Sequence, residues 1–331
     1  TASEKGRITK GAALALNARA MLYAKRYDKA AALAKAVMDL NVYSLYPSYR
    51  NLFSYAAENN SEVILNKEFI KDAYANDVMA LFAPFSILSN GVTVVPLKKI
   101  VDSYEMTNGK NINEAGSGFD AYNPYKNRDP RLKYSVYVPG DTLPTGAIFD
   151  SRPNSGTIDA VGSNYQVSVT GFYVKKYINK EDVNDLSNCG INIILLRYAE
   201  ILLTYAEAKI ELNQIDESVY DAINEVRKRP DVNMPSVIQP QSQEALRETV
   251  RNERMVELAF EGQRFFDIRR WAIAPEVFNV PILGLTYVNN GQLETVDQAG
   301  VVRSFQQRDY LWPIPQKEMD LNKNLKPNPG W

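Results

Sequence analysis

Two pairs of helix-forming segments, separated by about 150 residues, constrain the fold of this chain more than any other feature. Residues 8–41 contain two alanine-rich stretches that break around residues 26–28, and small side chains recur at helical spacing. Residues 193–228 repeat this pattern with a break near Asn213. Alternating small and large side chains are typical of tetratricopeptide helix pairs, which recur about every 34 residues in tandem arrays. The second pair therefore joins the first stack only if the intervening chain leaves the stack and returns.

The intervening residues 42–190 differ in composition from the helical segments. They carry most of the 20 tyrosines and several turn-rich stretches, among them SILSNG and SRPNSG. Residues 132–138 and 164–170 show strand-like alternation. We expect an irregular lobe with short strands, inserted into a helical framework. Long loops on a rigid scaffold are common locations for binding sites.

The rest of the chain completes a mainly α fold. A third long helix is expected at 242–261, followed by a short aromatic turn and a hairpin around VNNGQLETV. The proline-stiffened end should lie along the surface. The predicted organisation is a single domain, 1–331, divided into a first helix pair at 8–41, a loop-rich insertion lobe at 42–190, a second helix pair and ionic helix at 191–271, and a C-terminal loop region at 272–331.

Composition excludes several classes of function. The chain has no histidine, which excludes Ser-His-Asp and Cys-His nucleophile systems and metal sites that need imidazole. The 38 basic and 39 acidic residues nearly cancel, so nucleic acid is not expected as a partner. Cys189 is the single cysteine and is expected to be a buried thiol. We predict no cofactor and no metal site, since no calcium-loop spacing stands out.

The stretch RNERMVELAFEGQRFFDIRRW, residues 251–271, threads five arginines and four acidic residues through apolar ones. Helical spacing places Glu253, Glu257 and Glu261 on a face that also carries apolar side chains. Buried carboxylates need cationic partners. The expected partners are Arg197, Arg254, Arg264, Arg269 and Arg270.

Two of these glutamates could alternatively be the acid and the nucleophile of a glycoside hydrolase. Such carboxyl groups lie roughly 5–5.5 Å or 6.5–9.5 Å apart, and spacing at i and i+4 permits that. Both side chains would, however, leave one helix in nearly the same direction, whereas hydrolysis needs carboxylates on different sides of the sugar bond. Enclosure by core residues would also leave a glycan no room. We therefore interpret the glutamates as structural and predict no catalytic residue.

Seven motifs occur in order along the chain and together resemble the SusD/RagB family of nutrient-binding outer-membrane lipoproteins. The resemblance covers Gly11 to Trp331 and implies a SusD-like fold, with tetratricopeptide-type helix pairs on one side and long loops on the other. The motifs are KGAALALNARAMLYAKRYDKA, YEMTNGK, NRDPRL, GFYVKKY, LLRYAEILLTYAEAKIELNQ, RNERMVELAFEGQRFFDIRRW and YLWPIPQKEMDLNKNLKPNPGW.

The resemblance also implies a function. Family members capture oligosaccharides or polysaccharides without catalysis at the cell-surface face of the outer membrane, where they are lipid-anchored. They deliver their ligand to a SusC-type TonB-dependent transporter. Because this chain begins at what corresponds to the middle of a family member, we expect a fragment that lacks the N-terminal part. The alternatives are a carboxylate glycoside hydrolase, a protein-binding helical-repeat adaptor, and a peptide-capture member of the same family.

Ligand residues are expected in exposed loops, because sugars stack on aromatic rings and form hydrogen bonds with polar side chains. The alternative left open is that these aromatic residues pack the lobe onto the helices. The predicted ligand residues are Tyr74, Asn76, Phe82, Phe85, Ser89 and Asn90 in one segment, and Tyr122, Asn123 and Tyr125 in another.

Other charged or aromatic segments are interpreted as structural. The motif NRDPRL predicts a turn in which Arg128 and Arg131 pair with Asp129 or neighbouring acids. The tryptophans lie in segments with core or tail packing roles: Trp271, Trp312 and Trp331.

Overall fold

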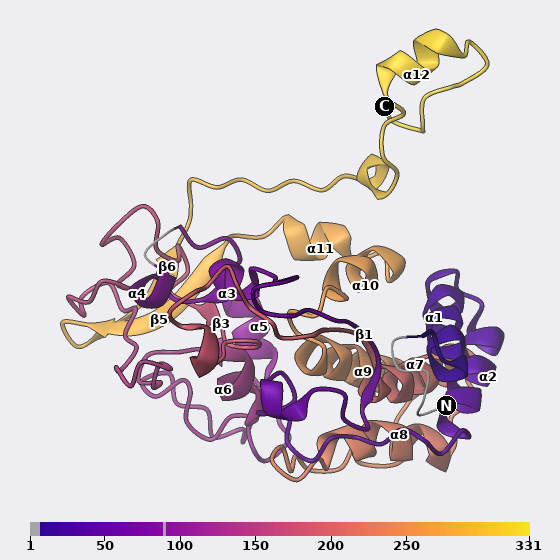
Figure 1. Cartoon of the computed structure of the whole chain (residues 1–331), viewed down its shortest axis with the longest axis horizontal. Coiled ribbons are helices and arrows are strands. Elements are labelled where there is room, and N and C mark those ends of the chain that lie inside the picture. Colours follow the sequence, from indigo (N-terminus) through magenta and orange to yellow (C-terminus); the bar gives the residue numbers. More distant parts are fainter. Residues whose placement is uncertain (1–6, 89–90) are drawn as a thin grey trace.

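The computed structural model describes residues 7–88 and 91–331. The longer helices gather at one end and in the centre of the molecule, whereas loops, short helices and most of the short strands occupy the opposite end (Figure 1). This arrangement confirms the predicted mainly α fold. The predicted ligand residues Ser89 and Asn90 lie outside the described residues.

The two helix pairs form one stack. In the first pair, α1 (Lys10–Tyr23) begins at Thr9, whose side chain accepts a hydrogen bond from the Ala12 amide, and α2 (Tyr27–Met38) follows directly. The second pair is α7 (Tyr198–Glu211) and α8 (Glu217–Arg227). Helix α2 packs against α7, and both pairs share one apolar core. The chain therefore leaves the stack after α2 and returns to it at α7.

Helix α9 (Gln243–Glu257) lies in the centre and packs against α5, α6, α7 and α8. The prediction that this helix continues to residue 261 is wrong. It ends at Glu257, because Phe260 adopts a positive φ of 63°, a left-handed conformation that no helix interior accommodates. The expected aromatic turn is also wrong in type, since these residues form helix α10 (Arg264–Arg270).

The described residues form three two-stranded antiparallel ladders, two of which tie distant segments together. The expectations of a strand at 164–170 and of helix from 193 are wrong, because residues 164–170 are turns and residues 193–197 are a strand. The predicted hairpin is confirmed, with Asn290 and Gly291 at the positive φ angles that a tight two-residue turn requires. The ladders are β1 (Val63–Lys67) with β4 (Ile193–Arg197), β2 (Val136–Tyr137) with β3 (Tyr173–Val174), and β5 (Leu283–Asn289) with β6 (Gln292–Asp297).

The remaining helices are short. Of the residues expected as a strand at 132–138, only 136 and 137 form one, because α6 occupies the start of that segment. None of the helices in the described part of the chain has the length and apolar character that crossing a bilayer requires. The short helices are η1 (Tyr55–Ala57), α3 (Val78–Phe82), α4 (Phe85–Leu88), α5 (Lys98–Ser103), α6 (Arg131–Ser135), η2 (Lys180–Asp182), α11 (Ala274–Phe278), η3 (Gln307–Tyr310) and α12 (Gln316–Leu321).

The C-terminal segment projects away from the body (Figure 1). The expectation that it lies along the surface is wrong for residues 311–331, in which the Trp312 side chain is 75% exposed. This segment folds on itself instead: the Asn328 amide donates to the Trp312 carbonyl, and the Trp331 indole donates to the Leu311 carbonyl. Its base is held by Arg269, which donates to the Tyr310 carbonyl.

Candidate functional site

Two glutamates of α9, Glu253 and Glu257, lie inside the protein and are paired with arginines. Glu257 is 0% exposed. Its carboxylate accepts hydrogen bonds from Arg197 at 2.7 Å and from Arg229 and Arg131 at 2.9 Å each. These contacts confirm the prediction that the acidic groups of this stretch point inward.

The two neighbouring glutamates extend the same network. Glu253 is 1% exposed and accepts from Arg227 at 2.9 Å and also from Arg131. Glu261, which lies in the turn after α9, accepts from Arg197 and Lys176 at 2.7 Å each. Each carboxylate thus has at least two cationic partners, as buried acidic groups require.

Of the five predicted partners, Arg197 is correct and the others are wrong. Nearness in sequence predicted these four partners, but the fold gives each of them other contacts. The other four have different contacts: Arg254 and Arg270 with Asp267 and Glu207, Arg264 with the Trp271 ring, and Arg269 with the carbonyl oxygens of Asp309 and Tyr310.

The partners that sequence reasoning missed come from the ends of other elements. Arg227 is the last residue of α8, Arg131 is the first of α6, and Arg229 and Lys176 lie just beyond α8 and β3. Arg131 also pairs with Asp129, as predicted from NRDPRL. Arg128, predicted to pair with an acid, donates instead to backbone carbonyl oxygens. The sequence signal for Arg227 and Arg229 was the run of basic residues at 227–229, where α8 ends.

Strand pairing brings one more acid into the network. Val63 of β1 lies opposite Arg197 of β4, which places Glu62 within 2.8 Å of the Arg197 guanidinium. Glu62 also pairs with Arg229. The network therefore joins the insertion lobe, through Glu62, Arg131 and Lys176, to the helical framework.

The electrostatics of the network keep Glu257 ionised. Burial alone would raise the pKa of Glu257, but the charges of Arg229, Arg197 and Arg131 outweigh burial and hold its pKa well below the usual range. A general acid needs a pKa near the working pH. Glu257 is therefore unsuited to donate a proton to a leaving group near neutral pH.

Other reactive groups are sparse in the described part of the chain. Cys189 is buried, as predicted, and burial raises the pKa of its thiol to about 11, so the reactive thiolate is scarce at neutral pH. Among residues 7–88 and 91–331, no three acidic or cysteine side chains gather in a way that could hold a metal ion.

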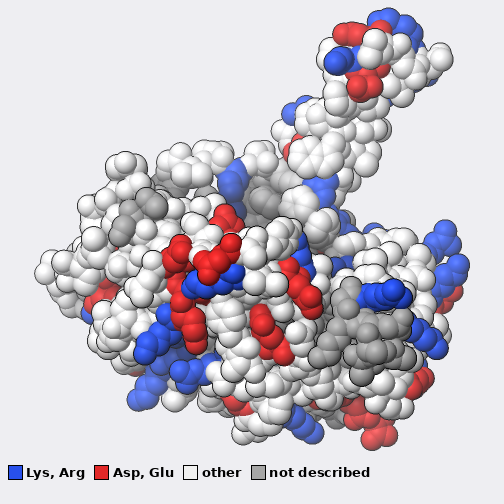
Figure 2. Space-filling model, in the orientation of Figure 1, with Lys and Arg blue, Asp and Glu red and all other residues white. Residues whose placement is uncertain are grey.

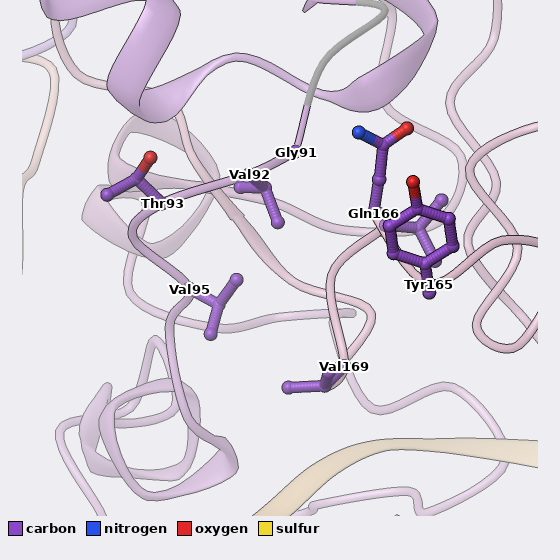
Figure 3. Close-up of a pocket in the computed structure, with 8 residues that line it drawn as sticks. Gly91, Val92, Thr93, Val95, Tyr165, Gln166 and Val169 are labelled. Carbon is purple, nitrogen blue, oxygen red and sulfur yellow. The ribbon is translucent and has the colours of Figure 1, made fainter.

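An open cavity of about 350 Å³ lies between two loop segments of the insertion lobe (Figure 3). Residues 91–95 form one wall, and residues 165–169 form the other. The Tyr165 side chain is 93% exposed and stands beside the Gln166 amide. The cavity thus combines an aromatic ring, an amide and an apolar floor. Its lining residues are Gly91, Val92, Thr93, Val95, Tyr165, Gln166, Val167 and Val169.

Hydrogen bonds hold the two walls of this cavity in place. The Val92 amide donates to the Gln166 carbonyl at 3.1 Å, which joins the walls directly. The Thr170 hydroxyl donates to the Pro96 carbonyl at 2.6 Å. Strand β5 packs so closely that a Cβ at Gly284 would lie 2.3 Å from the Thr170 carbonyl oxygen. A rigid base of this kind preorganises the cavity.

None of the described residues that line the cavity is charged. In Figure 2, the surface at the upper left, where the loops lie, is largely free of charged residues, whereas acidic and basic groups are dense across the centre. Uncharged polar groups beside an aromatic ring suit a neutral, hydroxyl-rich ligand.

Of the first set of predicted ligand residues, Tyr74 is exposed and Asn76 is fully engaged. Tyr74 is 58% exposed and stacks on Phe69, with ring centroids 5.4 Å apart. The Asn76 amide donates to the carbonyl oxygens of Cys189 and Ile191, and its own oxygen accepts from the Val78 amide. Asn76 thus fixes the backbone around it.

The phenylalanines of this set lie deeper. Phe85 is 7% exposed. Phe82 is half-buried and lines a second cavity of about 310 Å³, between α1, α3, β4 and the turn after α9. Other residues that line this cavity are Arg19, Val78, Tyr177, Ile193, Ile194, Leu195, Phe260, Glu261, Gly262, Gln263 and Phe266.

The second predicted set divides in the same way. Tyr122 is 57% exposed. The Asn123 amide donates to Asp120 at 2.7 Å. Tyr125 packs edge-on against Phe172, and its buried hydroxyl has no hydrogen-bond partner in the described structure. Neither set includes Tyr165, whose signal in the sequence was an aromatic residue between asparagine and glutamine in a turn-rich segment.

Comparison with known proteins finds a family and several relatives that are similar in sequence. Residues 61–331 match the SusD family. SusD-like protein P2 from Formosa agariphila is 35% identical over 154 residues, which are 45% of this chain and 28% of that protein. SusD-like protein P25 from the same organism is 24% identical over 285 residues, which are 83% of this chain and 52% of that protein.

Solved structures share the fold. A SusD-like carbohydrate-binding protein from Bacteroides fragilis has a TM-score of 0.88 and 31% identity, over 98% of this chain and 66% of that chain. A second SusD-like protein from B. fragilis has a TM-score of 0.80 and 30% identity, over 100% of this chain and 67% of that chain. The chain thus spans about a quarter to two thirds of the length of these relatives. With the family match across most of its length, the chain belongs to the SusD family.

Proposed function

We propose that this protein captures oligosaccharides without chemically altering them, and that the cavity beside Tyr165 is a ligand site. The observation that carries the proposal is a tyrosine ring, 93% exposed, at the edge of a rigid cavity whose described lining residues carry no charge. A ring this exposed has a face free to stack on the apolar face of a sugar.

The chemistry of the cavity supports this ligand class. A sugar presents an apolar C–H face that stacks on an aromatic ring, while its hydroxyl groups reach amide and hydroxyl side chains. Gln166 and Thr93 supply such groups next to the ring. The similar structure from B. fragilis is described as carbohydrate-binding.

Absence of catalysis is part of the proposal. The carboxylates that could have served a glycoside hydrolase are held by arginines in the interior, where Glu253 and Glu257 are at most 1% exposed. Oligosaccharide binding without turnover suits a protein that passes its ligand on. We propose, from the resemblance to the family, that the full-length protein is lipid-anchored at the cell-surface face of the outer membrane and delivers its ligand to a SusC-type TonB-dependent transporter.

Affinity electrophoresis in gels that contain single polysaccharides tests the ligand class. We expect at least one neutral polysaccharide to retard the wild type, and Tyr165→Ala to weaken that binding about fivefold to tenfold, since one aromatic stack contributes about 1 kcal/mol. Trp312→Ala is the matched control, because Trp312 is also exposed but lies on the projecting C-terminal segment.

The proposal fails if Tyr165→Ala and Trp312→Ala bind every retained polysaccharide as tightly as the wild type does. Release of reducing ends by the wild type, but not by Glu257→Gln, would show catalysis instead of capture. Binding to peptides but to no polysaccharide would support the peptide-capture alternative.

A further inference from the structure

A short hairpin in the insertion lobe carries a second exposed aromatic surface with a cation beside it. The rings of Phe69 and Tyr74 stack with an interplanar angle of 10°. The Lys67 ammonium lies 4.9 Å from the Phe69 centroid and 5.6 Å from the Tyr74 centroid. Since Tyr74 is 58% exposed, the ring pair leaves an aromatic surface open to solvent next to a positive charge.

The Lys67 ammonium has no carboxylate partner among the described residues. Two acids of this region are engaged elsewhere: Asp72 accepts from the Asn188 amide, and Asp182 accepts from Lys71 and from the Tyr55 hydroxyl. Contacts with ring faces hold an ammonium in position but use none of its three N–H donors as hydrogen bonds to oxygen. These donors therefore remain available for an anion.

The hairpin that presents these side chains is rigid. The amides of Ile70 and Tyr74 each donate to the other residue's carbonyl, at 2.9 Å and 2.8 Å. At the tip, Asp72 adopts a positive φ of 67° and its amide donates to Asn188 at 2.8 Å. The Asn76 amide ties the hairpin's end to residues 189 and 191. The ring pair and the ammonium are thus positioned before a ligand arrives, which lowers the entropic cost of binding.

We propose that Lys67, Phe69 and Tyr74 form a binding site for an anionic sugar unit, one that carries a carboxylate or a sulfate. The sugar ring would stack on the exposed Tyr74 surface, and the Lys67 ammonium would donate to the anionic group. This inference rests on the proposed oligosaccharide capture and adds to it a charged substrate class. The charge separates this site from the uncharged cavity beside Tyr165.

Matched polysaccharides that differ only in charge test the proposal. The wild type is titrated with polygalacturonate and with its methyl-esterified form, and with dextran sulfate and neutral dextran. Lys67→Met keeps the length of the side chain and removes the charge. Lys133→Met is the control, because Lys133 is exposed and its ammonium lies over no aromatic ring of the described residues.

We expect tighter binding to at least one anionic member of the two pairs than to its neutral counterpart. Lys67→Met should weaken that binding about threefold to tenfold, as loss of one exposed charge-assisted contact would, and added salt should reduce it. Lys133→Met should bind like the wild type. If Lys67→Met weakens binding to polygalacturonate alone, the ligand carries a carboxylate. If it weakens binding to dextran sulfate alone, the ligand carries a sulfate.

Equal binding of anionic and neutral forms overturns the proposal, as does an equal effect of Lys67→Met and Lys133→Met. The failure of oligosaccharide capture itself looks different. If the wild type still binds a neutral polysaccharide through Tyr165, only the anionic site is wrong, whereas absence of all polysaccharide binding rejects both.

Discussion

The ionic network around α9 and the loop surface differ in what their side chains contact. In the network, each carboxylate meets two or three cations, and Glu257 is 0% exposed. At the loop surface, Tyr165 is 93% exposed, and the Lys67 ammonium contacts rings but no carboxylate of the residues that the structure describes. The carboxylates of the network are satisfied within the protein, whereas the Tyr165 ring and the Lys67 ammonium remain open to a ligand.

This difference separates structural charge from recognition. A buried ion pair contributes little net stability compared with apolar packing, but removal of one partner leaves an uncompensated buried charge. An exposed ring has few internal contacts to lose. Substitutions in the network should therefore act on the free energy of unfolding, and substitutions at the loop surface should act on binding.

The largest effect is expected for Glu257→Gln. The substitution leaves Arg131, Arg197 and Arg229 with one carboxylate fewer and should lower the free energy of unfolding by about 3–5 kcal/mol. Glu248→Gln on the same helix is the control, because the Glu248 side chain is 72% exposed. Urea denaturation measures both. A change below about 0.5 kcal/mol for Glu257→Gln would place this carboxylate in contact with solvent.

A slightly smaller loss of stability is expected for Phe85→Ala. Phe85 is 7% exposed, and truncation of a buried phenylalanine costs about 3 kcal/mol. Tyr165→Ala should change stability by less than about 0.5 kcal/mol. If Phe85→Ala weakens polysaccharide binding while its unfolding midpoint stays unchanged, Phe85 belongs to the ligand site, as the sequence predicted.

Acid should destabilise the protein through Glu207. Burial opposes its ionisation, but Arg270 and Arg254 outweigh burial and lower the pKa to about 2. In the unfolded chain the pKa of this carboxyl group is about 4.3. Its stabilisation of the folded state is therefore complete above that pH and is lost as the pH falls toward 2. The expected loss of stability is on the order of 3 kcal/mol. The free energy of unfolding, measured between pH 5 and pH 2, should fall less steeply for Glu207→Gln than for the wild type. Identical slopes against pH would contradict the assignment.

The smallest effect is expected for a surface ion pair. Lys35 and Asp39 pair on α2 with side chains 49% and 59% exposed. Asp39→Asn should cost less than about 0.5 kcal/mol, because solvent screens both charges. A cost comparable to that of Glu257→Gln would mean that burial does not separate structural from incidental charge in this protein.

The sequence predicted the helical elements better than their ends. Small residues at helical spacing correctly located α1, α2, α7 and α8, because that period reflects close helix packing. The end of α9 could not be predicted, since it depends on the left-handed conformation of Phe260, and phenylalanine has no preference for it.

Prediction of the site was less complete. Inward-facing glutamates followed from periodicity, but Arg131 lies 126 residues from Glu257 in sequence, and only the tertiary fold brings them together. Exposure of aromatic residues also depends on tertiary packing. The loop composition alone did not separate exposed Tyr74 from buried Phe85.

Hydrogen–deuterium exchange, with and without the polysaccharide fragment that binds most tightly, tests most directly whether the ionic network is structural and the loops bind the ligand. The ligand should slow the exchange of residues 91–95 and 165–169 and leave the exchange of residues 253–261 unchanged. Protection of residues 253–261, with unchanged exchange in both loop segments, would contradict this division.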